Sequence, residues 1–146
     1  MRGLMIKGLA AALVALPLTT AADDAGDIKY RQAVMKGIAG HAGAVAQIAK
    51  GKVSHTAALS GHTHALYELT KLVPAAFKNE TSGKSRSKAN VWSDWSGFDG
   101  ASGDMERAAL ALNEAAKAGP AAAAAKLGDL FDTCKGCHKE YRAKKK

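Results

Sequence analysis

Five consecutive residues near the end of the chain, Cys134-Lys135-Gly136-Cys137-His138, constrain the fold more than any other stretch. Positions i, i+3 and i+4 of an α-helix lie on one face, so the two thiols and the imidazole would project to the same side. Two cysteines with this spacing, followed at once by histidine, form the attachment pattern of a c-type haem. The thiols of Cys134 and Cys137 would reach the two vinyl groups of one porphyrin, and His138 would reach its iron.

Two other interpretations of the cysteine pair stay open, although the haem interpretation is favoured. A structural zinc site normally takes four ligands, often from two such pairs, and this chain has only two cysteines. A Cys134–Cys137 disulfide would be permitted in an oxidising compartment. A thioredoxin-like motif needs a strand before the first cysteine, and the residues before Cys134 have a helical pattern.

The first residues have the order of charge, apolar run and small residues that is typical of a secretory signal peptide. Arg2 and Lys7 come before an apolar run over 8–18, and Thr20-Ala21-Ala22 follow it. A membrane-spanning helix needs about 20 apolar residues, and this run is shorter.

From this order we expect residues 1–22 to be a signal peptide that is cleaved near Ala22. Residues 23–146 would then form the mature haem domain, which is not expected to span a membrane. Export agrees with the haem motif, because bacterial c-type haem is attached outside the cytoplasm. The sequence therefore predicts a periplasmic protein.

The chain is basic, with a formal net charge of +8. Without Arg2 and Lys7, 19 basic residues remain against 13 acidic ones. Aromatic residues are few and no nucleic-acid-binding motif is visible, so nucleic acid is not an expected partner. Three lysines at 144–146 follow the haem motif and favour redox partner proteins with acidic surfaces.

Helical periodicity runs through most of the mature chain, without a convincing strand. Stop and start residues divide it into helices expected over 27–51, 54–74, from 91 or 93 to 119, and 120–142, with a polar loop over 74–90. Long helices joined by short links imply an all-α fold, an antiparallel four-helix bundle with covalently attached haem.

Two of the inward faces bear on the cofactor. In the last helix, the apolar positions run directly into the haem motif: Leu127, Leu130, Phe131, Cys134, Cys137, His138 and Tyr141. The porphyrin is therefore expected to fill the space between the helices near one end. In the second helix His62 falls on the inward face and is a second, weaker candidate for the iron.

These features together resemble the class II c-type cytochromes, the family of cytochrome c′ and its low-spin relatives such as cytochrome c556. The matching pieces are Lys29-Tyr30-Arg31-Gln32, Val91-Trp92-Ser93-Asp94 and the run from Cys134 to Arg142. The resemblance covers essentially the whole mature chain. It implies a four-helix bundle with one covalent haem c, often assembled as a homodimer.

The resemblance also implies roles for residues outside the motif. Arg31 and Gln32 match positions beside the haem propionates and pocket, and Thr81 and Ser82 match a loop that touches the haem, although many members have Glu where this chain has Ser82. Met35 matches the side chain above the open haem face. In cytochrome c′ that side chain only covers the iron, whereas in low-spin relatives a methionine sulfur is the sixth ligand.

Two functions follow from these two roles of Met35. The first is single-electron transfer by a periplasmic cytochrome with His138 proximal and Met35 distal. The alternative is a five-coordinate cytochrome c′ that binds nitric oxide or carbon monoxide at the open face. An enzyme such as a peroxidase is not expected, because no His/Arg acid–base pair is apparent beside Met35.

Overall fold

A computed structural model describes residues 20–145, and of residues 20–23 only the backbone. The expected signal peptide, residues 1–22, lies outside this range apart from its last three residues. The helices are α1 (Thr20–Ala49), the 3₁₀ helix η1 (Thr56–Ala58), α2 (Leu59–Thr70), α3 (Val73–Phe77), α4 (Asn90–Ser93), α5 (Trp95–Ala116) and α6 (Pro120–Tyr141).

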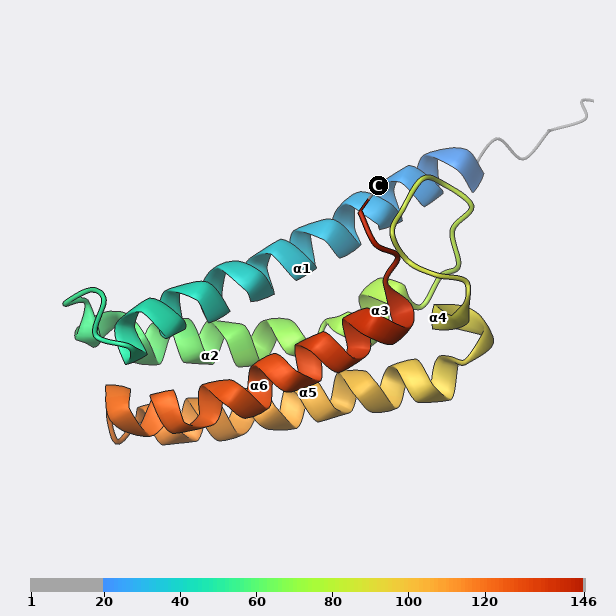
Figure 1. Ribbon diagram of the computed structural model, residues 1–146. Helices are drawn as coiled ribbons and strands as arrows, with labels where there is room; N and C mark the ends of the chain where they lie inside the picture. Colours follow the sequence, from blue (N-terminus) through green and yellow to red (C-terminus); the bar gives the residue numbers. More distant parts are fainter. Residues whose placement is uncertain (1–19, 146) are drawn as a thin grey trace, which may run out of the picture.

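The four long helices form an antiparallel bundle, as predicted (Figure 1). Going round the bundle, α1 packs against α2, α2 against α5, α5 against α6, and α6 against α1. Short connections join α1 to α2 and α5 to α6, whereas α3, an extended loop and α4 lie between α2 and α5. Within residues 20–145, every helix is too short or too polar to cross a lipid bilayer.

Each long helix contributes a fully buried aliphatic side chain to the core. Val45 of α1, Leu66 of α2, Leu112 of α5 and Leu130 of α6 all have no exposed surface. These residues lie on the apolar faces that the three-four spacing predicted. The core therefore begins where all four helices meet and continues towards the end of the bundle that carries α3 and α4.

The first helix begins earlier than the sequence predicted. It was expected from Asp27, but α1 starts at Thr20. Its end agrees with the prediction: α1 stops at Ala49, and Gly51 has a φ of 66°, a conformation that glycine adopts without strain.

The second helix also differs at both ends. Ser54 is not its N-cap, because η1 comes before α2 and neither has a side-chain cap. Pro74 does not end the helix either: α2 stops at Thr70, and Pro74 lies in the first turn of α3. Proline fits a first turn because the missing N–H would have no helical partner there. A short helix thus occupies the start of the expected loop.

The start of the third long helix is set by Asp94. This residue ends α4 and caps α5, its carboxylate accepting a hydrogen bond from the backbone N–H of Gly97 at 3.2 Å. A Cβ on Gly97 would lie 2.5 Å from the Tyr141 hydroxyl oxygen, so a larger residue here would displace the Tyr141 and Asp94 side chains.

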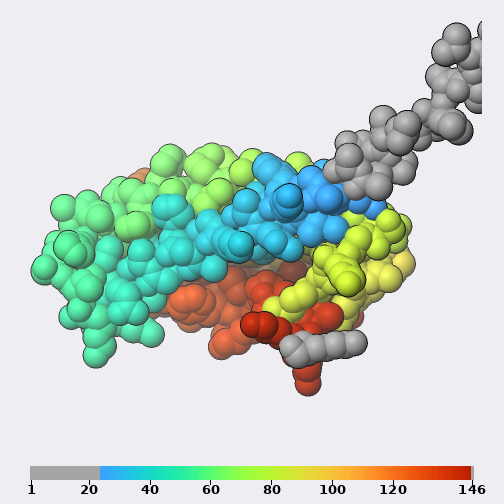
Figure 2. All heavy atoms as spheres, turned by 90° about the horizontal axis from the view of Figure 1, so that it is seen from above, coloured from blue at the N-terminus to red at the C-terminus, as the bar shows by residue number. Residues whose placement is uncertain are grey.

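The loop before α4 and the end of the chain lie side by side. Figure 2 shows the yellow-green loop against the red C-terminal residues. Ser87 and Arg142 form an isolated antiparallel bridge, and the backbone N–H of Lys88 donates to the Tyr141 carbonyl at 3.0 Å. These contacts bring the loop to the end of α6, which carries the cysteine motif.

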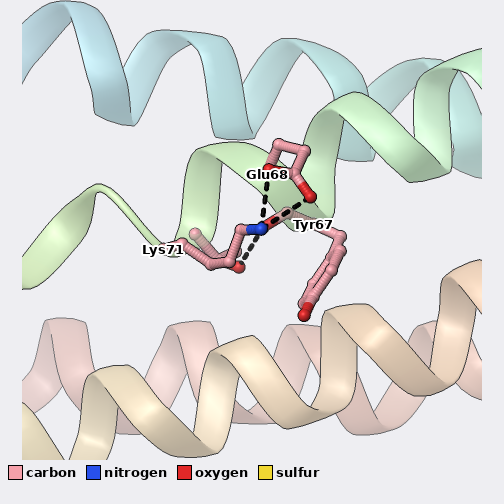
Figure 3. A network of polar contacts seen from close by, with 4 residues as sticks. Tyr67, Glu68 and Lys71 are labelled. Carbon is pink, nitrogen blue, oxygen red and sulfur yellow. Dashed lines mark hydrogen bonds and ion pairs between the residues drawn. The ribbon is translucent and has the colours of Figure 1, made fainter.

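Surface ion pairs on the long helices join neighbouring turns of one helix. Figure 3 shows one of them, in which the Lys71 ammonium lies 2.6 Å from a Glu68 carboxylate oxygen and 4.7 Å from the centre of the Tyr67 ring. The hydrogen bond to Glu68 raises the pKa of Lys71. Such exposed pairs contribute little to stability, so the fold depends on its core.

Leu112→Ala tests this dependence, because Leu112 is fully buried among the four helices. We expect the free energy of unfolding to fall by about 2–5 kcal/mol, from the lost apolar contact and the cavity left behind. The measurement is urea unfolding of the haem-loaded protein followed by circular dichroism.

The control is Leu110→Ala on the same helix, because the Leu110 side chain is 40% exposed. Its effect should stay below about 1 kcal/mol. Equal losses for the two variants would contradict the assignment of Leu112 to the core.

Candidate haem-binding site

A cavity of about 650 Å³ lies between α1, α5 and α6 at the end of the bundle that carries α3 and α4. Its walls are mostly apolar, and its polar residues come from α1, the loop before α4, α5 and the end of α6. The residues that line it include Arg31, Gln32, Met35, Phe77, Arg86, Phe98, Ser102, Met105, Phe131, Cys134, Cys137, His138, Tyr141 and Arg142.

The three side chains of the motif all line this cavity. Cys134, Cys137 and His138 lie on α6, are half-buried, and share the face that the i, i+3, i+4 spacing predicted. The two cysteines are not joined in a disulfide. The expected juxtaposition of two thiols and one imidazole is therefore present in the folded chain.

The surroundings of the motif influence its protonation. Burial lowers the pKa of His138, and the positive charges of Arg142 and Arg86 lower it further. The neutral imidazole, which is the form that binds a metal, is thus favoured. Burial raises the pKa of the Cys134 and Cys137 thiols in the chain before haem is attached.

Two methionines line the cavity from different helices. Met35 of α1 is partly buried, and Met105 of α5 is buried. The sequence singled out Met35 as a site residue, but not Met105. Ser102, one turn before Met105, also lines the cavity and is 2% exposed.

Arg31 is buried, with 3% of its surface exposed, and its guanidinium contacts several protein groups. Its Nε donates to the Ala76 carbonyl and its Nη1 to the Thr81 hydroxyl, both at 2.9 Å, and its Nη2 donates to the Asn79 carbonyl. The guanidinium also lies over the Trp92 ring at 5.1 Å. Arg31 therefore joins α1 to the segment after α3 as well as lining the cavity.

Arg31 also shows how burial and charge compete. Burial lowers its pKa, and the nearby carboxylates of Asp27 and Asp24 raise it. A buried cation without hydrogen bonds would be very costly. The carbonyls of Ala76 and Asn79 and the Thr81 hydroxyl supply those bonds within the protein. From the sequence, only the haem propionates were expected as partners of Arg31.

The other residues suggested by the resemblance lie at different distances from the cavity. Gln32 is exposed and lines the rim. Thr81 and Ser82 are not among the lining residues: Thr81 binds Arg31, and the Ser82 hydroxyl donates to the Asp24 carboxylate at 2.6 Å. The loop reaches the cavity instead through residues 85–87, because Ser82 is held against the start of α1.

His62 does not line the cavity, so the structure removes it from the candidates for the iron. It faces His41 of α1, with the two Nδ1 atoms 3.0 Å apart. The zinc interpretation loses support as well. Within residues 20–145 there is no group of three or more His, Cys, Asp or Glu side chains that could hold a metal ion.

Arg86 is a site residue that the sequence did not single out. It lies in a loop without periodicity, and its guanidinium donates to the Ala143 carbonyl, from Nε at 2.9 Å and from Nη2 at 2.6 Å. These bonds place it beside His138. Only the pairing of the loop with the C-terminal segment reveals it, and no local sequence pattern would have found it.

A second hollow lies on the outer side of the motif and is strongly basic. Five of its nine lining residues are lysine or arginine: Arg86, Lys135, Lys139, Arg142 and Lys144. It shares Cys134 and His138 with the main cavity. Positive charge thus surrounds the exposed edge of the motif.

Tyr141 closes the cavity at the end of α6. Its hydroxyl donates to the Asp94 carboxylate at 2.8 Å, and its ring meets the Phe98 ring edge-on at 5.3 Å. Burial, together with the hydrogen bond to Asp94, raises the pKa of Tyr141 to about 12. The residue therefore joins α6 to the capped start of α5.

The cavity fits a haem in both size and chemistry. Its volume lies within the range of about 300–1,000 Å³ that small-molecule and cofactor pockets occupy. Apolar walls suit a porphyrin, and two free thiols and an imidazole on one helix face are the donor set of the attachment motif.

Comparison with known proteins agrees with this geometry. The family model described as Cytochrome C′ matches residues 27–142. The chain belongs to the cytochrome c′ family. It is 36% identical to cytochrome c′ of Rhodospirillum rubrum over 146 residues, which cover 98% of this chain and 99% of that protein. The assignment to the class II c-type cytochromes is thus confirmed.

Solved structures of cytochrome c′ share the fold. The crystal structure from Rubrivivax gelatinosus has a TM-score of 0.75 and 33% identity, covering 82% of this chain and 97% of that one. The nitric oxide complex of the L16A mutant of cytochrome c prime from Alcaligenes xylosoxidans has a TM-score of 0.76 and 28% identity, covering 88% of this chain and 100% of that one.

Cytochrome c′ proteins bind one covalently attached c-type haem, and so does this chain. The cofactor predicted from the motif is therefore confirmed. The haem also explains why the bundle keeps an apolar cavity of this size at one end.

Tyr141→Phe tests the hydrogen bond from the Tyr141 hydroxyl to Asp94 at the end of α6. A group whose pKa rises from about 10 in the unfolded chain to about 12 on folding contributes stability that is complete below pH 10. That contribution is lost as the pH rises through 12. The wild type should therefore lose its advantage over the variant between pH 10 and pH 12, as measured by urea midpoints from circular dichroism.

Tyr30→Phe is the control, since the Tyr30 side chain is 51% exposed. It should show the same stability difference from the wild type at every pH. A difference for Tyr141→Phe that does not change over this range would refute the role of its hydroxyl.

Proposed function

We propose that this protein is a five-coordinate cytochrome c′ that binds nitric oxide or carbon monoxide at a haem face covered by Met35. The proposal rests chiefly on the apolar cavity, in which Met35 lies on one helix and the motif histidine on another. Nitric oxide complexes among the similar structures support it. Ferrous haem iron supplies the affinity for such diatomic molecules.

In this proposal the residues of the chain have separate tasks. Cys134 and Cys137 form the thioethers that hold the cofactor, and the neutral imidazole of His138 binds the iron from the proximal side. Met35 and Met105 keep the cavity apolar and exclude water. Arg31 and Gln32 lie where they can pair with the haem propionates, while Thr81 orients Arg31 and Ser82 holds the loop against α1.

Met35 is assigned the task of covering the iron, not of binding it. A flexible thioether in an apolar cavity fills space well and can move aside for a small molecule. This role differs from the first function that the sequence suggested, single-electron transfer with Met35 as the distal ligand. That function stays a second candidate, since Met35 and His138 line one cavity.

We further propose that the protein works in the periplasm, as a binding protein and not as an enzyme. Within the described chain, the lining residues of the cavity include His138 as their one histidine. A peroxidase-type acid–base pair on the Met35 side therefore has no histidine to use. Assembly as a homodimer is proposed from the family alone.

The two roles of Met35 are separated by replacing its sulfur and its bulk independently. Met35→Leu keeps the bulk, so if Met35 only covers the iron, the high-spin ferric spectrum should stay unchanged. Met35→Ala opens the face, and carbon monoxide should bind the ferrous protein at least about tenfold faster, equal to about 1.4 kcal/mol of barrier. Optical spectra and flash photolysis give both results.

A wild-type protein that is low-spin, and that Met35→Leu converts to high-spin, would show that the sulfur binds the iron. The electron-transfer function would then replace the present proposal. Met105→Leu, which conserves volume on the opposite helix, should leave the carbon monoxide rate unchanged.

The basic residues around the motif favour redox partners with acidic surfaces. Electron exchange with a small acidic ferredoxin should slow by about tenfold when ionic strength rises from 0.01 to 0.15 M, because the screening length falls from about 30 to 8 Å. Lys139→Glu should slow it at low salt, as measured by stopped flow.

Lys50→Glu at the opposite end of the bundle is the matched control, since Lys50 follows the end of α1 and is exposed. It removes the same charge and should have a much smaller effect. If the two variants behaved alike, net charge would explain the rate and no docking surface need exist.

A further inference from the structure

Two histidines outside the haem cavity face each other across the α1–α2 interface. His41 of α1 and His62 of α2 lie 21 positions apart in the chain, with their Nδ1 atoms 3.0 Å apart and their ring centres 5.2 Å apart. Both are half-buried, so each ring still reaches solvent. Neither lines the haem cavity, and the proposed function uses neither.

The interface brings them together at a defined position. One helical turn before His41, Gly37 meets the Leu69 side chain, and a Cβ on Gly37 would lie 3.0 Å from its Cδ1. Leu69 lies two turns after His62 on α2, as an antiparallel helix pair requires. The packing at Gly37 thus sets how closely the two helices, and hence the two imidazoles, approach.

The spacing of the two nitrogens suits two ligands of one metal ion. Metal–imidazole bonds are about 2.0 Å long, so nitrogens 3.0 Å apart subtend roughly 95° at a shared ion. This angle is close to the 90° or so between adjacent ligands of square-planar or octahedral Ni²⁺ and Cu²⁺, both of which accept imidazole. The tetrahedral angle preferred by zinc is wider.

The helix surfaces beside the pair have space for a hydrated ion. Gly40 and Gly61 precede the two histidines, and a Cβ built on either glycine meets no atom within 4 Å. No third His, Cys, Asp or Glu joins the pair within residues 20–145. Water would therefore complete the coordination sphere.

We propose that His41 and His62 form a two-histidine site for a divalent transition-metal ion, with Ni²⁺ or Cu²⁺ as the preferred class. The metal-free pair has one imidazole N–H that donates to the other ring nitrogen. When the ion binds, the donating ring changes tautomer and its proton moves from Nδ1 to Nε2 through solvent, so both Nδ1 lone pairs face the ion. Affinity for the ion then falls as the pH is lowered, because protons compete for the same nitrogens.

The site joins two helices, so it exists only in the folded chain. An ion that binds the folded chain and not the unfolded one raises the stability of the protein in proportion to the logarithm of its concentration. The ion would hold the α1–α2 pair together on a face of these helices that does not line the haem cavity. This consequence does not depend on the function proposed for the haem.

The test measures Ni²⁺ binding to the untagged, haem-loaded ferric protein by isothermal titration calorimetry. We expect one ion per chain, at least tenfold weaker binding in His41→Ala and in His62→Ala, and a higher unfolding temperature with Ni²⁺ in the wild type but not in these two variants. His64→Ala is the matched control, an exposed histidine on the same helix, and should bind like the wild type.

His62→Gln separates the metal site from a structural role. Its amide can still hydrogen-bond His41, so the metal-free unfolding temperature should stay close to that of the wild type while Ni²⁺ binding is lost. The proposal is overturned if His41→Ala, His62→Ala or His62→Gln still binds Ni²⁺ as the wild type does, or if His64→Ala loses binding equally. It is also overturned if Ni²⁺ shifts the Soret band, because the ion would then lie at the haem.

Discussion

The structure depends on one face of α6, which must both pack against its neighbours and present the two thiols and the imidazole. Leu127 and Leu130 belong to the core, and one turn later the same face reaches the cavity with Cys134, Cys137 and His138. The helices therefore cannot close on each other at this end. The apolar space of about 650 Å³ needs the haem as a filling, because an empty cavity of this size would forgo a large amount of packing energy.

Polar contacts close the bundle around this space. Arg31 is buried and held by two carbonyls and a hydroxyl, which fix the residues after α3 against α1. Tyr141 and Asp94 join the ends of α6 and α5, and the loop pairs with the C-terminal segment. Each of these contacts links residues more than forty positions apart, so the rim of the cavity is set by long-range hydrogen bonds and not by helix propensity.

Charge is distributed unevenly around the motif, and this has two effects. Arg86 and Arg142, together with burial, favour a neutral His138 that is ready to bind iron. The same cations, with Lys135 and Lys139, make the outer edge of the motif basic. Positive charge therefore serves the metal ligand on the inside and can attract acidic proteins on the outside.

Local residue patterns alone determined the four long helices, their inward faces, the end of α1 shortly before Gly51, the start of α6 at Pro120, and the haem motif with its three side chains on one face. They did so because helical periodicity and motif spacing depend on residues only a few positions apart. The resemblance to class II cytochromes added Met35 and Arg31, which both line the cavity.

Tertiary structure decided the rest: the partners of Arg31, the place of Arg86 beside His138, the turning of Ser82 towards Asp24, and the pairing of His41 with His62. The sequence also misplaced Pro74 and the start of the third long helix, because a proline or an aspartate is compatible with several positions near a helix end. These features arise where segments distant in the chain meet, and no local pattern encodes which distant group a side chain will contact.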